Sequence, residues 1–450
     1  MAKSLKNKGW SVVLAGTGIN LALGVLYTWS IFKGAISDSI KQGTPGGFQW
    51  DLASINDPYA VCCLMFAFSM ILAGKCQDRF GPRLTATIGG LLVGAGFLLL
   101  SQTTNYWLWV LGFGVMAGMG FGFGYSSATP PALKWFPPAK TGLIAGIVVS
   151  GFGLASVYIA PLSMYLLKNG GLQWAMMFFG MAFAIVVSLF ALLLQNPPAG
   201  YLFGGAAAKA QTAKATAPAK VQDFTPSQML KTGNFYVLWV VYFIGAGAGL
   251  MVIGSVAGMA KQSMGELAFL AVVILAVGNA AGRIIAGSLS DRIGRTLTLS
   301  LMLGFQAVLM FAAIPVVGAE HPSAFLLVLI ATGIGFNYGT NLALFPAIAK
   351  DFWGLKNFGI NYGVLFSAWG VGGFVLGRAS EMMKAATGGF ALSFGVAGIL
   401  LAVAAVTLMM QDLFRQMVQA KVAEELARRA EEAAQAAQAA ALQPALEQVA

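Results

Sequence analysis

Charged side chains are scarce in this sequence. Asp, Glu, Lys and Arg make up only 10% of its 450 residues and hydrophobic residues make up 58%, whereas about 25% of an ordinary soluble domain is charged. A water-soluble fold of this composition would have too little polar surface to cover itself. The composition therefore excludes a cytosolic enzyme, a nucleic-acid-binding domain and a disordered protein. It predicts a chain embedded in a lipid bilayer.

Cysteine and histidine are also rare. The three cysteines, Cys62, Cys63 and Cys76, lie in the first fifth of the chain and cannot form a disulfide framework. The one histidine, His321, lies in a short polar break, which excludes a histidine-based metal site or catalytic triad. Because the sequence also contains no nucleophile and base pair and no phosphate-binding loop, we expect no enzymatic activity, no cofactor and no bound metal.

Long hydrophobic runs occupy most of the chain. A membrane helix needs about 20 apolar residues, and twelve stretches qualify. The first follows MAKSLKNKG and is too long to be a removable signal peptide, so we expect it to remain as a span. The predicted spans are 11–32, 58–75, 84–102, 106–130, 141–166, 173–195, 235–258, 267–289, 297–316, 323–348, 360–381 and 389–411.

Lysine and arginine are unevenly distributed between the two sides of these spans. If both termini are cytoplasmic, 20 of the 27 Lys and Arg residues lie in inner segments and six lie in outer segments. This asymmetry follows the positive-inside rule. The net charge of +11 therefore reflects orientation rather than an anionic partner. We predict a multi-pass protein of the cell membrane, inner or plasma, with its N- and C-termini in the cytoplasm.

The two halves of the chain resemble each other. The run GKCQDRFGPR at 74–83 recurs as GSLSDRIGRT at 287–296, and Gly and Pro positions in the fourth span recur in the tenth. The recurring positions are Gly118, Gly124 and Pro131, matched by Gly333, Gly339 and Pro346. This duplication predicts an all-α membrane protein of twelve transmembrane helices in two parallel six-helix halves, 1–195 and 233–411.

The segments outside these halves are polar. Residues 196–232 include an Ala/Lys/Gly-rich stretch that predicts a flexible cytoplasmic linker. Residues 412–450 are rich in Ala and Glu, and Glu424 and Glu425 precede Arg428 and Arg429 by four residues. This spacing predicts an exposed cytoplasmic helix. A role of this tail in oligomerisation or partner binding is the less favoured alternative.

The repeated motif places Asp78, Arg79, Asp291 and Arg292 at helix ends. An acid and an arginine there can form a charge-assisted bond to a neighbouring helix end, which breaks when the two halves rock. The alternative is that all four are solvated loop charges. Because the motif occurs twice at matching positions, we favour a gating role.

One charge, Arg283, lies inside a span. It is about eight residues, hence about 12 Å, from the cytoplasmic end of its helix, and a charge at this depth costs about 3 kcal/mol. It could extend to the headgroups, but the small residues at 278–282 favour a cavity wall. No acid is placed at this depth to neutralise it. Arg283 therefore predicts a small carboxylate anion as its partner.

Other polar and aromatic side chains lie in helix interiors. Tyr125 and Tyr338 are deep and occupy equivalent stretches of the two halves, so we expect both to line the cavity. For Tyr27, a place in the aromatic belt at the membrane surface is an equal alternative. Phe152 and Trp369 are further candidates for the cavity wall.

Several stretches carry a family resemblance. GVLYTWSIF, GFGLAS, DFTPSQMLKTGNFYVLW, GNAAGRIIAGSLSDRIGR and ALFPAIAKDFWGLKNFGINYG together resemble the oxalate/formate antiporter family of the major facilitator superfamily, which is close to the monocarboxylate transporters. The resemblance covers nearly the whole of 1–411. It implies the major facilitator fold and secondary active transport by alternating access, with a monomer as the functional unit. It also implies that Arg283 binds substrate and that Tyr27, Tyr125 and Tyr338 line the site.

Two positions depart from the family pattern. The oxalate exchangers carry a lysine where this chain has Trp369, so its single fixed positive charge favours a monocarboxylate such as lactate, pyruvate or formate. Animal monocarboxylate transporters have an aspartate used in proton coupling where this chain has Asn279. We expect protons to be the coupling ion, with anion exchange and a non-transporting carboxylate sensor as alternatives. An exporter of hydrophobic or cationic compounds is disfavoured, because such a protein would need an acid at mid-membrane.

Overall fold

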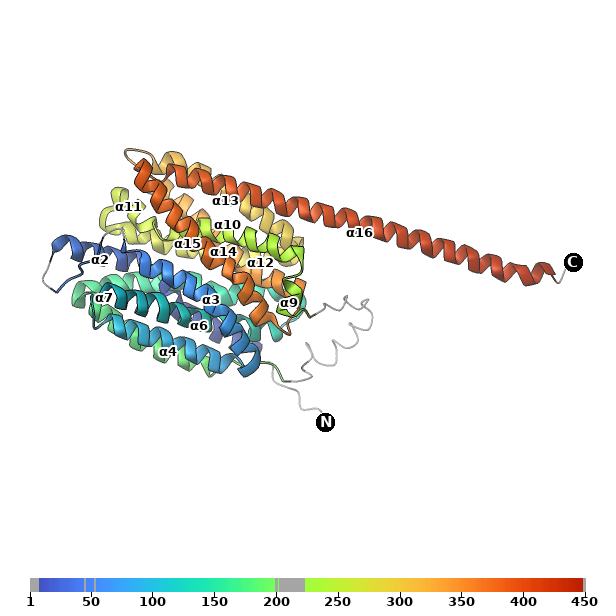
Figure 1. Cartoon of the computed structure of the whole chain (residues 1–450), viewed down its shortest axis with the longest axis horizontal. Coiled ribbons are helices and arrows are strands. Elements are labelled where there is room, and N and C mark those ends of the chain that lie inside the picture. The colour runs from blue at the N-terminus through green and yellow to red at the C-terminus, as the bar shows by residue number, and fades with distance from the viewer. Residues whose placement is uncertain (1–7, 44–45, 52–53, 199–200, 202–222, 448–450) are drawn as a thin grey trace. The chain divides into compact units, whose positions relative to one another are not determined.

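The computed structural model describes residues 8–43, 46–51, 54–198, 201 and 223–447, and every regular element in these ranges is helical (Figure 1). The apolar runs form helices because a backbone in lipid must satisfy its own hydrogen bonds. The elements before the linker are α1 (Gly9–Leu23), η1 (Gly24–Thr28), α2 (Trp29–Gln42), α3 (Asp57–Phe80), α4 (Pro82–Leu100), α5 (Tyr106–Trp109), η3 (Val110–Ala117), α6 (Gly118–Lys134), η4 (Pro138–Lys140) and α7 (Thr141–Ala191).

A short helix, α9 (Pro226–Met229), follows the linker and is capped by a reciprocal pair of bonds between Thr225 and Gln228. The longer helices then succeed one another with short connections. They are α10 (Gly233–Ile253), α11 (Val256–Met264), η5 (Gly265–Ala268), α12 (Phe269–Ile293), α13 (Arg295–Val317), α14 (Ala324–Trp353), α15 (Phe358–Thr387) and α16 (Ala391–Glu447).

The twelve predicted spans are all present. Ten helical segments are long and apolar enough to cross a membrane, and two of them contain two spans each. In α7 the two spans meet at Gly171, whose φ of 75° is readily adopted only by glycine. In Gly233–Ile293 the spans are α10 and α12, separated by α11 and η5. The prediction of an all-α membrane protein is therefore confirmed.

Helices from the first and second parts of the chain pack closely on one another. The most extensive such pairs are α3 with α15 and α7 with α12. In the second pair, a Cβ atom at Gly146 would overlap the carbonyl oxygen of Arg283, so the absence of a side chain allows the two helices to approach. This approach brings the backbone of α7 against α12, the span that carries the fully buried Arg283.

The chain divides into two compact units, 1–405 and 406–450. The second unit is helical as predicted, because α16 continues to Glu447. Arg428 lies 3.0 Å from an oxygen of Glu425 and 3.9 Å from one of Glu432, whereas the expected ion pair with Glu424 is not found in the described part of this helix. The Arg429 side chain lies outside the described residues, so the expected pair of Glu425 and Arg429 stays a prediction. Most of the predicted linker, 202–222, lies outside the described residues, and the division into halves at 195 and 233 stays a prediction.

Candidate functional site

Arg283 lies in the middle of α12 and is fully buried by protein. Its guanidinium donates three hydrogen bonds: from Nε to Asn279 Oδ1 at 2.9 Å, from Nη2 to the hydroxyl of Tyr27 at 3.4 Å, and from Nη1 to the carbonyl oxygen of Val149. All three acceptors are neutral. The side chain does not extend towards the headgroups, and its charge faces the interior between η1, α7 and α12.

Small residues leave the space that this arginine occupies. A Cβ atom at Gly153 of α7 would lie 3.2 Å from Asn279 Oδ1 and 3.3 Å from Arg283 Nε, a tight contact that any larger side chain would worsen. On the opposite side of α12, a Cβ at Gly282 would overlap the backbone of Phe336 in α14. The run of small residues at 278–282 thus packs α12 against α14 while Arg283 faces α7.

A chain of hydrogen bonds extends from the arginine across to α14 and α15. The hydroxyls of Tyr27 and Tyr338 lie 2.6 Å apart, and Trp369 Nε1 donates to the Tyr338 oxygen at 2.8 Å. Tyr27 is 5% exposed, so it belongs to this interior network rather than to an aromatic belt at the membrane surface. The predicted residues Arg283, Asn279, Tyr27, Tyr338 and Trp369 therefore meet in one place.

Aromatic rings enclose this network. The ring of Phe152 lies edge-on to Tyr27 and Tyr125, with centroids 5.1 and 5.6 Å away. Phe66 of α3 and Phe366 of α15 complete the wall, with centroids 5.3 Å apart. These last two were not predicted, because a phenylalanine in an apolar helix carries no sequence signal that separates a site wall from ordinary core.

The buried hydroxyl of Tyr125 has no hydrogen-bond partner within the described residues. The ring of Tyr125 lies among Phe66, Phe152 and Phe366, and its centroid is 5.6 Å from the centroid of each of these three rings. A buried hydroxyl without a partner costs free energy. The side chain of Tyr362 is the neighbouring polar group with which this hydroxyl interacts.

No acid neutralises Arg283. Among the residues that the structure describes, no Asp or Glu oxygen lies within 4.0 Å of its guanidinium, and every ion pair found involves Arg295, Arg378 or Arg428 instead. A buried cation with only neutral acceptors is costly and favours an anionic partner. Its planar donors match a carboxylate bidentately.

Asp291 of the second motif binds the start of another helix. Its two carboxylate oxygens accept hydrogen bonds from the backbone N–H groups of Gly142 and Leu143, each at 3.0 Å, at the first turn of α7. A carboxylate there also interacts favourably with the helix dipole. Arg295 Nη1 lies 2.5 Å from Asp291, and Arg295 Nε lies 3.0 Å from Asp351.

Asp78 of the first motif does the same at the start of α15, where it accepts a hydrogen bond from Ile360 N at 3.2 Å. Each acid thus caps a helix of the other predicted half: Asp78 caps the later α15, and Asp291 caps the earlier α7. The neighbouring arginines behave differently: no ion pair joins Arg79 or Arg292 to an acid in the described ranges, and Arg79 lies over the ring of Phe80. The gating role of all four residues stays a prediction.

Two cavities of about 500 Å³ and about 230 Å³ lie at the opposite ends of the helices from Asp78 and Asp291. Their walls come from α2, the start of α3, the α10–α11 turn and the late turns of α15. In Figure 1, α2 and α11 lie at one end of the bundle and α9 at the other. The enclosed Arg283 network lies between these cavities and the helix starts held by the two acids.

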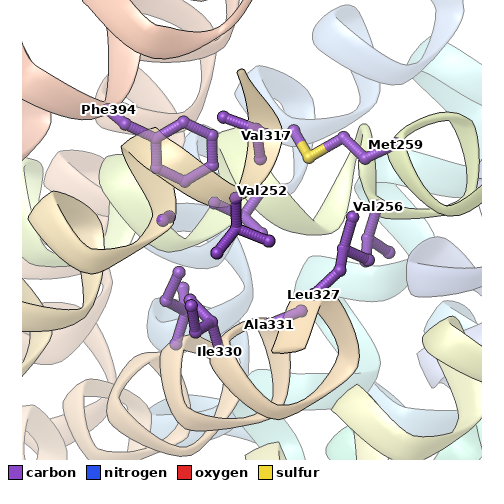
Figure 2. A pocket seen from close by; sticks show the side chains of 11 residues that line it. Val252, Val256, Met259, Val317, Leu327, Ile330, Ala331 and Phe394 are labelled. Carbon is purple, nitrogen blue, oxygen red and sulfur yellow. The ribbon is translucent and has the colours of Figure 1, made fainter. Parts of the chain in front are cut away.

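A third, much smaller crevice of about 20 Å³ lies among α10, α11, α13, α14 and the start of α16. Figure 2 shows the side chains that line it, which include Val252, Met259, Val317 and Phe394. All of its lining side chains are apolar. It offers no donor for an anion and is not a candidate for the substrate site.

Comparisons with known proteins agree with this architecture. The family model of the Major Facilitator Superfamily matches residues 9–377. An oxalate:formate antiporter of Oxalobacter formigenes is 29% identical over 375 residues, 81% of this chain and 82% of the relative. Monocarboxylate transporter 13 of Bos taurus is 24% identical over 402 residues, 87% of each chain.

Solved structures share the fold. The proton:xylose symporter XylE superposes with a TM-score of 0.65 at 15% identity, over 89% of this chain and 95% of that one. At this identity the likeness shows the fold alone. The predicted resemblance is confirmed, and the protein is a multi-pass membrane transporter rather than an enzyme: the chain belongs to the major facilitator superfamily.

Proposed function

We propose that this protein is a secondary active transporter of small monocarboxylates, of the lactate, pyruvate or formate type, working by alternating access. The observation that carries the proposal is the full burial of Arg283 among neutral acceptors. A carboxylate would supply the missing negative charge and accept the guanidinium N–H groups in pairs. The formate and monocarboxylate named for two relatives agree with this chemistry.

A single fixed cation supports one carboxylate rather than two. Tyr338 and Trp369 fill the side of the site opposite Arg283 with a neutral hydrogen-bonded pair. A second carboxylate group placed there would be buried without a cation, at a cost of several kcal/mol. The site therefore favours monocarboxylates over oxalate.

We propose protons as the coupling ion, with anion exchange as the alternative. Bringing an uncompensated anion into a negative-inside cell costs about 2.3 kcal/mol per 100 mV, so accumulation requires either a co-transported proton or an exported anion. Asn279, which binds Arg283, does not titrate. Any proton carried would thus be held elsewhere in the protein or travel with the substrate.

Uptake into proteoliposomes tests the proposal. Labelled lactate, pyruvate and formate are offered with and without an inward proton gradient, and with and without internal unlabelled anion. We expect uptake of at least one anion, accelerated by the proton gradient. Acceleration only by internal anion would establish exchange instead. Binding without any flux would indicate a sensor.

Arg283 variants test the site itself. We expect Arg283→Lys and Arg283→Gln to lower kcat/KM by at least about 100-fold, because each loses the paired contact to a buried carboxylate. Arg428→Gln is the control: it removes an exposed arginine of the C-terminal helix, outside the predicted substrate site and the two gating motifs. Normal transport by either Arg283 variant would refute the site assignment.

A further inference from the structure

A second group of charges surrounds the two larger cavities. Lys33 and Glu381 line both, Arg378 and Asp57 line the larger one, and Lys384 lines the smaller one. Arg378 Nη1 lies 3.2 Å from Asp57 Oδ1. The charges of Arg378 and Asp57 neutralise each other. The other three charged residues, Lys33, Lys384 and Glu381, all line the smaller cavity.

The smaller cavity, of about 230 Å³, has an excess of positive charge. Two lysines, Lys33 and Lys384, line it with a single acid, Glu381. Glu381 attracts Lys33 while Lys384 repels it, and Glu381 also accepts a hydrogen bond from Ser255 at 3.4 Å. An anion placed between the lysines would remove their mutual repulsion.

The same cavity offers a free hydroxyl and open space. Ser30 Oγ is buried and has no hydrogen-bond partner in the described part of the chain. Gly34 and Gly258 also line the cavity, and a Cβ atom at either would meet no atom within 4 Å. A carboxylate matches this cavity, because it can accept hydrogen bonds both from the lysine ammonium groups and from the Ser30 hydroxyl.

We propose that Lys33, Lys384 and Ser30 form an outer binding site for the transported carboxylate, occupied before the anion reaches Arg283. The inference rests on the proposed function, because the ligand is the same anion. The walls of the site come from α2, the α10–α11 turn and α15, and so from both predicted halves. Positive charge at the mouth of a path raises the local concentration of an anion and its association rate.

Equilibrium binding separates this site from the central one. The probe is the labelled monocarboxylate that the wild type transports, measured on the purified protein. We expect Arg283→Gln to retain a weak binding site, with a Kd on the order of 1 mM. Adding Lys33→Gln or Lys384→Gln should weaken that residual binding at least about tenfold. Adding Lys41→Gln, which removes a lysine of the same helix that lines neither cavity, should leave it unchanged.

A cavity-filling variant tests the site without changing charge. Gly258→Leu in the Arg283→Gln background should abolish the residual binding, and the open space at this position keeps the fold intact. In the otherwise native protein, Lys33→Gln should lower the association and dissociation rates at the central site by the same factor, about fivefold. The association rate of the anion with Lys33→Gln should also depend less on ionic strength than its association rate with the wild type.

The two proposals fail in different ways. If the wild type neither binds nor transports a monocarboxylate, the proposed function fails. If the wild type transports but folded Arg283→Gln shows no residual binding, or if that binding survives Lys33→Gln, Lys384→Gln and Gly258→Leu, only the outer site is refuted.

Discussion

The hydroxyl groups of Tyr27 and Tyr338 lie 2.6 Å apart although 311 residues separate them along the chain. Tyr338 also accepts a hydrogen bond from Trp369, and Tyr27 accepts one from Arg283. These contacts join the first span to α12, α14 and α15 around one buried cation. Alternating access moves the two halves of a transporter relative to each other. We therefore expect this network to rearrange during each transport cycle.

Removing either hydroxyl should impair transport. Tyr27→Phe and Tyr338→Phe keep the aromatic packing but remove the hydrogen bonds, and each should lower kcat/KM for the monocarboxylate about tenfold. The double variant should lose less than the product of the single effects, because the two hydroxyls act on each other. Proteoliposome uptake measures all three.

Tyr158→Phe is the control for these variants. Its hydroxyl donates to the backbone of Leu21 at 3.0 Å on an exposed surface, away from the network. We expect near-normal uptake from it. Strictly additive losses at Tyr27 and Tyr338 would show that their contact has no part in transport.

The candidate site was partly predictable because its charge and hydroxyls leave a signal in an apolar sequence. Arg283 stands out because a charge inside a membrane span costs free energy. Tyr125 and Tyr338 stand out because both lie deep in a span and occupy equivalent stretches of the two halves. The carbonyl of Val149 leaves no such signal, since any residue supplies a backbone oxygen. Its position beside Arg283 depends on how closely α7 approaches α12, which the composition of either helix alone does not determine.

The fold was more predictable than the contacts between its parts. Span length follows from bilayer thickness, and all twelve runs are helices. The motif spacing predicted acids at helix ends, but not which residues would face them. Asp291 pairs with Arg295, one turn further on, and not with the adjacent Arg292. Neighbours in a helix point in different directions, whereas residues four apart share a face.

Because Asp291 pairs with Arg295 and not with Arg292, we expect unequal effects from substituting the two arginines. Arg295→Gln removes the partner of both Asp291 and Asp351 and should favour opening of the α7–α12 ends. Arg292 forms no ion pair in the described ranges, so Arg292→Gln should open these ends less than Arg295→Gln does. Accessibility of a cysteine introduced at Leu143 reports the opening, in a background without native cysteines. We expect about a fivefold faster modification in Arg295→Gln. Equal rates in the two variants would contradict the assignment.

The close approach of α7 and α12 should be sensitive to a single methyl group. Gly146→Ala places a Cβ against the Arg283 carbonyl and should lower stability by about 1–3 kcal/mol, because the two helices must move apart. Thermal unfolding in detergent measures the loss. Gly304→Ala is the control, since its Cβ would lie 4.0 Å from Ala405. A native melting temperature for Gly146→Ala would show that this contact is loose.

The end of the linker holds the start of α15 together with Asp78. Asp223 Oδ1 accepts hydrogen bonds from Leu355 N at 3.0 Å and Lys356 N at 3.1 Å, and Phe224 N donates to the carbonyl oxygen of Trp353. These bonds fix the turn that leads into the helix whose first N–H groups Asp78 caps. The linker should therefore stabilise the contact between Asp78 and the start of α15 at this end of the bundle.

Asp223→Ala tests this role of the linker. It removes the acceptor of two backbone N–H groups, so the amides of Leu355 and Lys356 should exchange with solvent about tenfold faster. Hydrogen exchange followed by mass spectrometry measures the rate on the full chain in detergent. Asp38→Ala changes an exposed acid at the other end of the bundle and should leave the 353–360 segment unaffected. Unchanged exchange of that segment in Asp223→Ala would show that α15 starts independently of the linker, held by Asp78 alone.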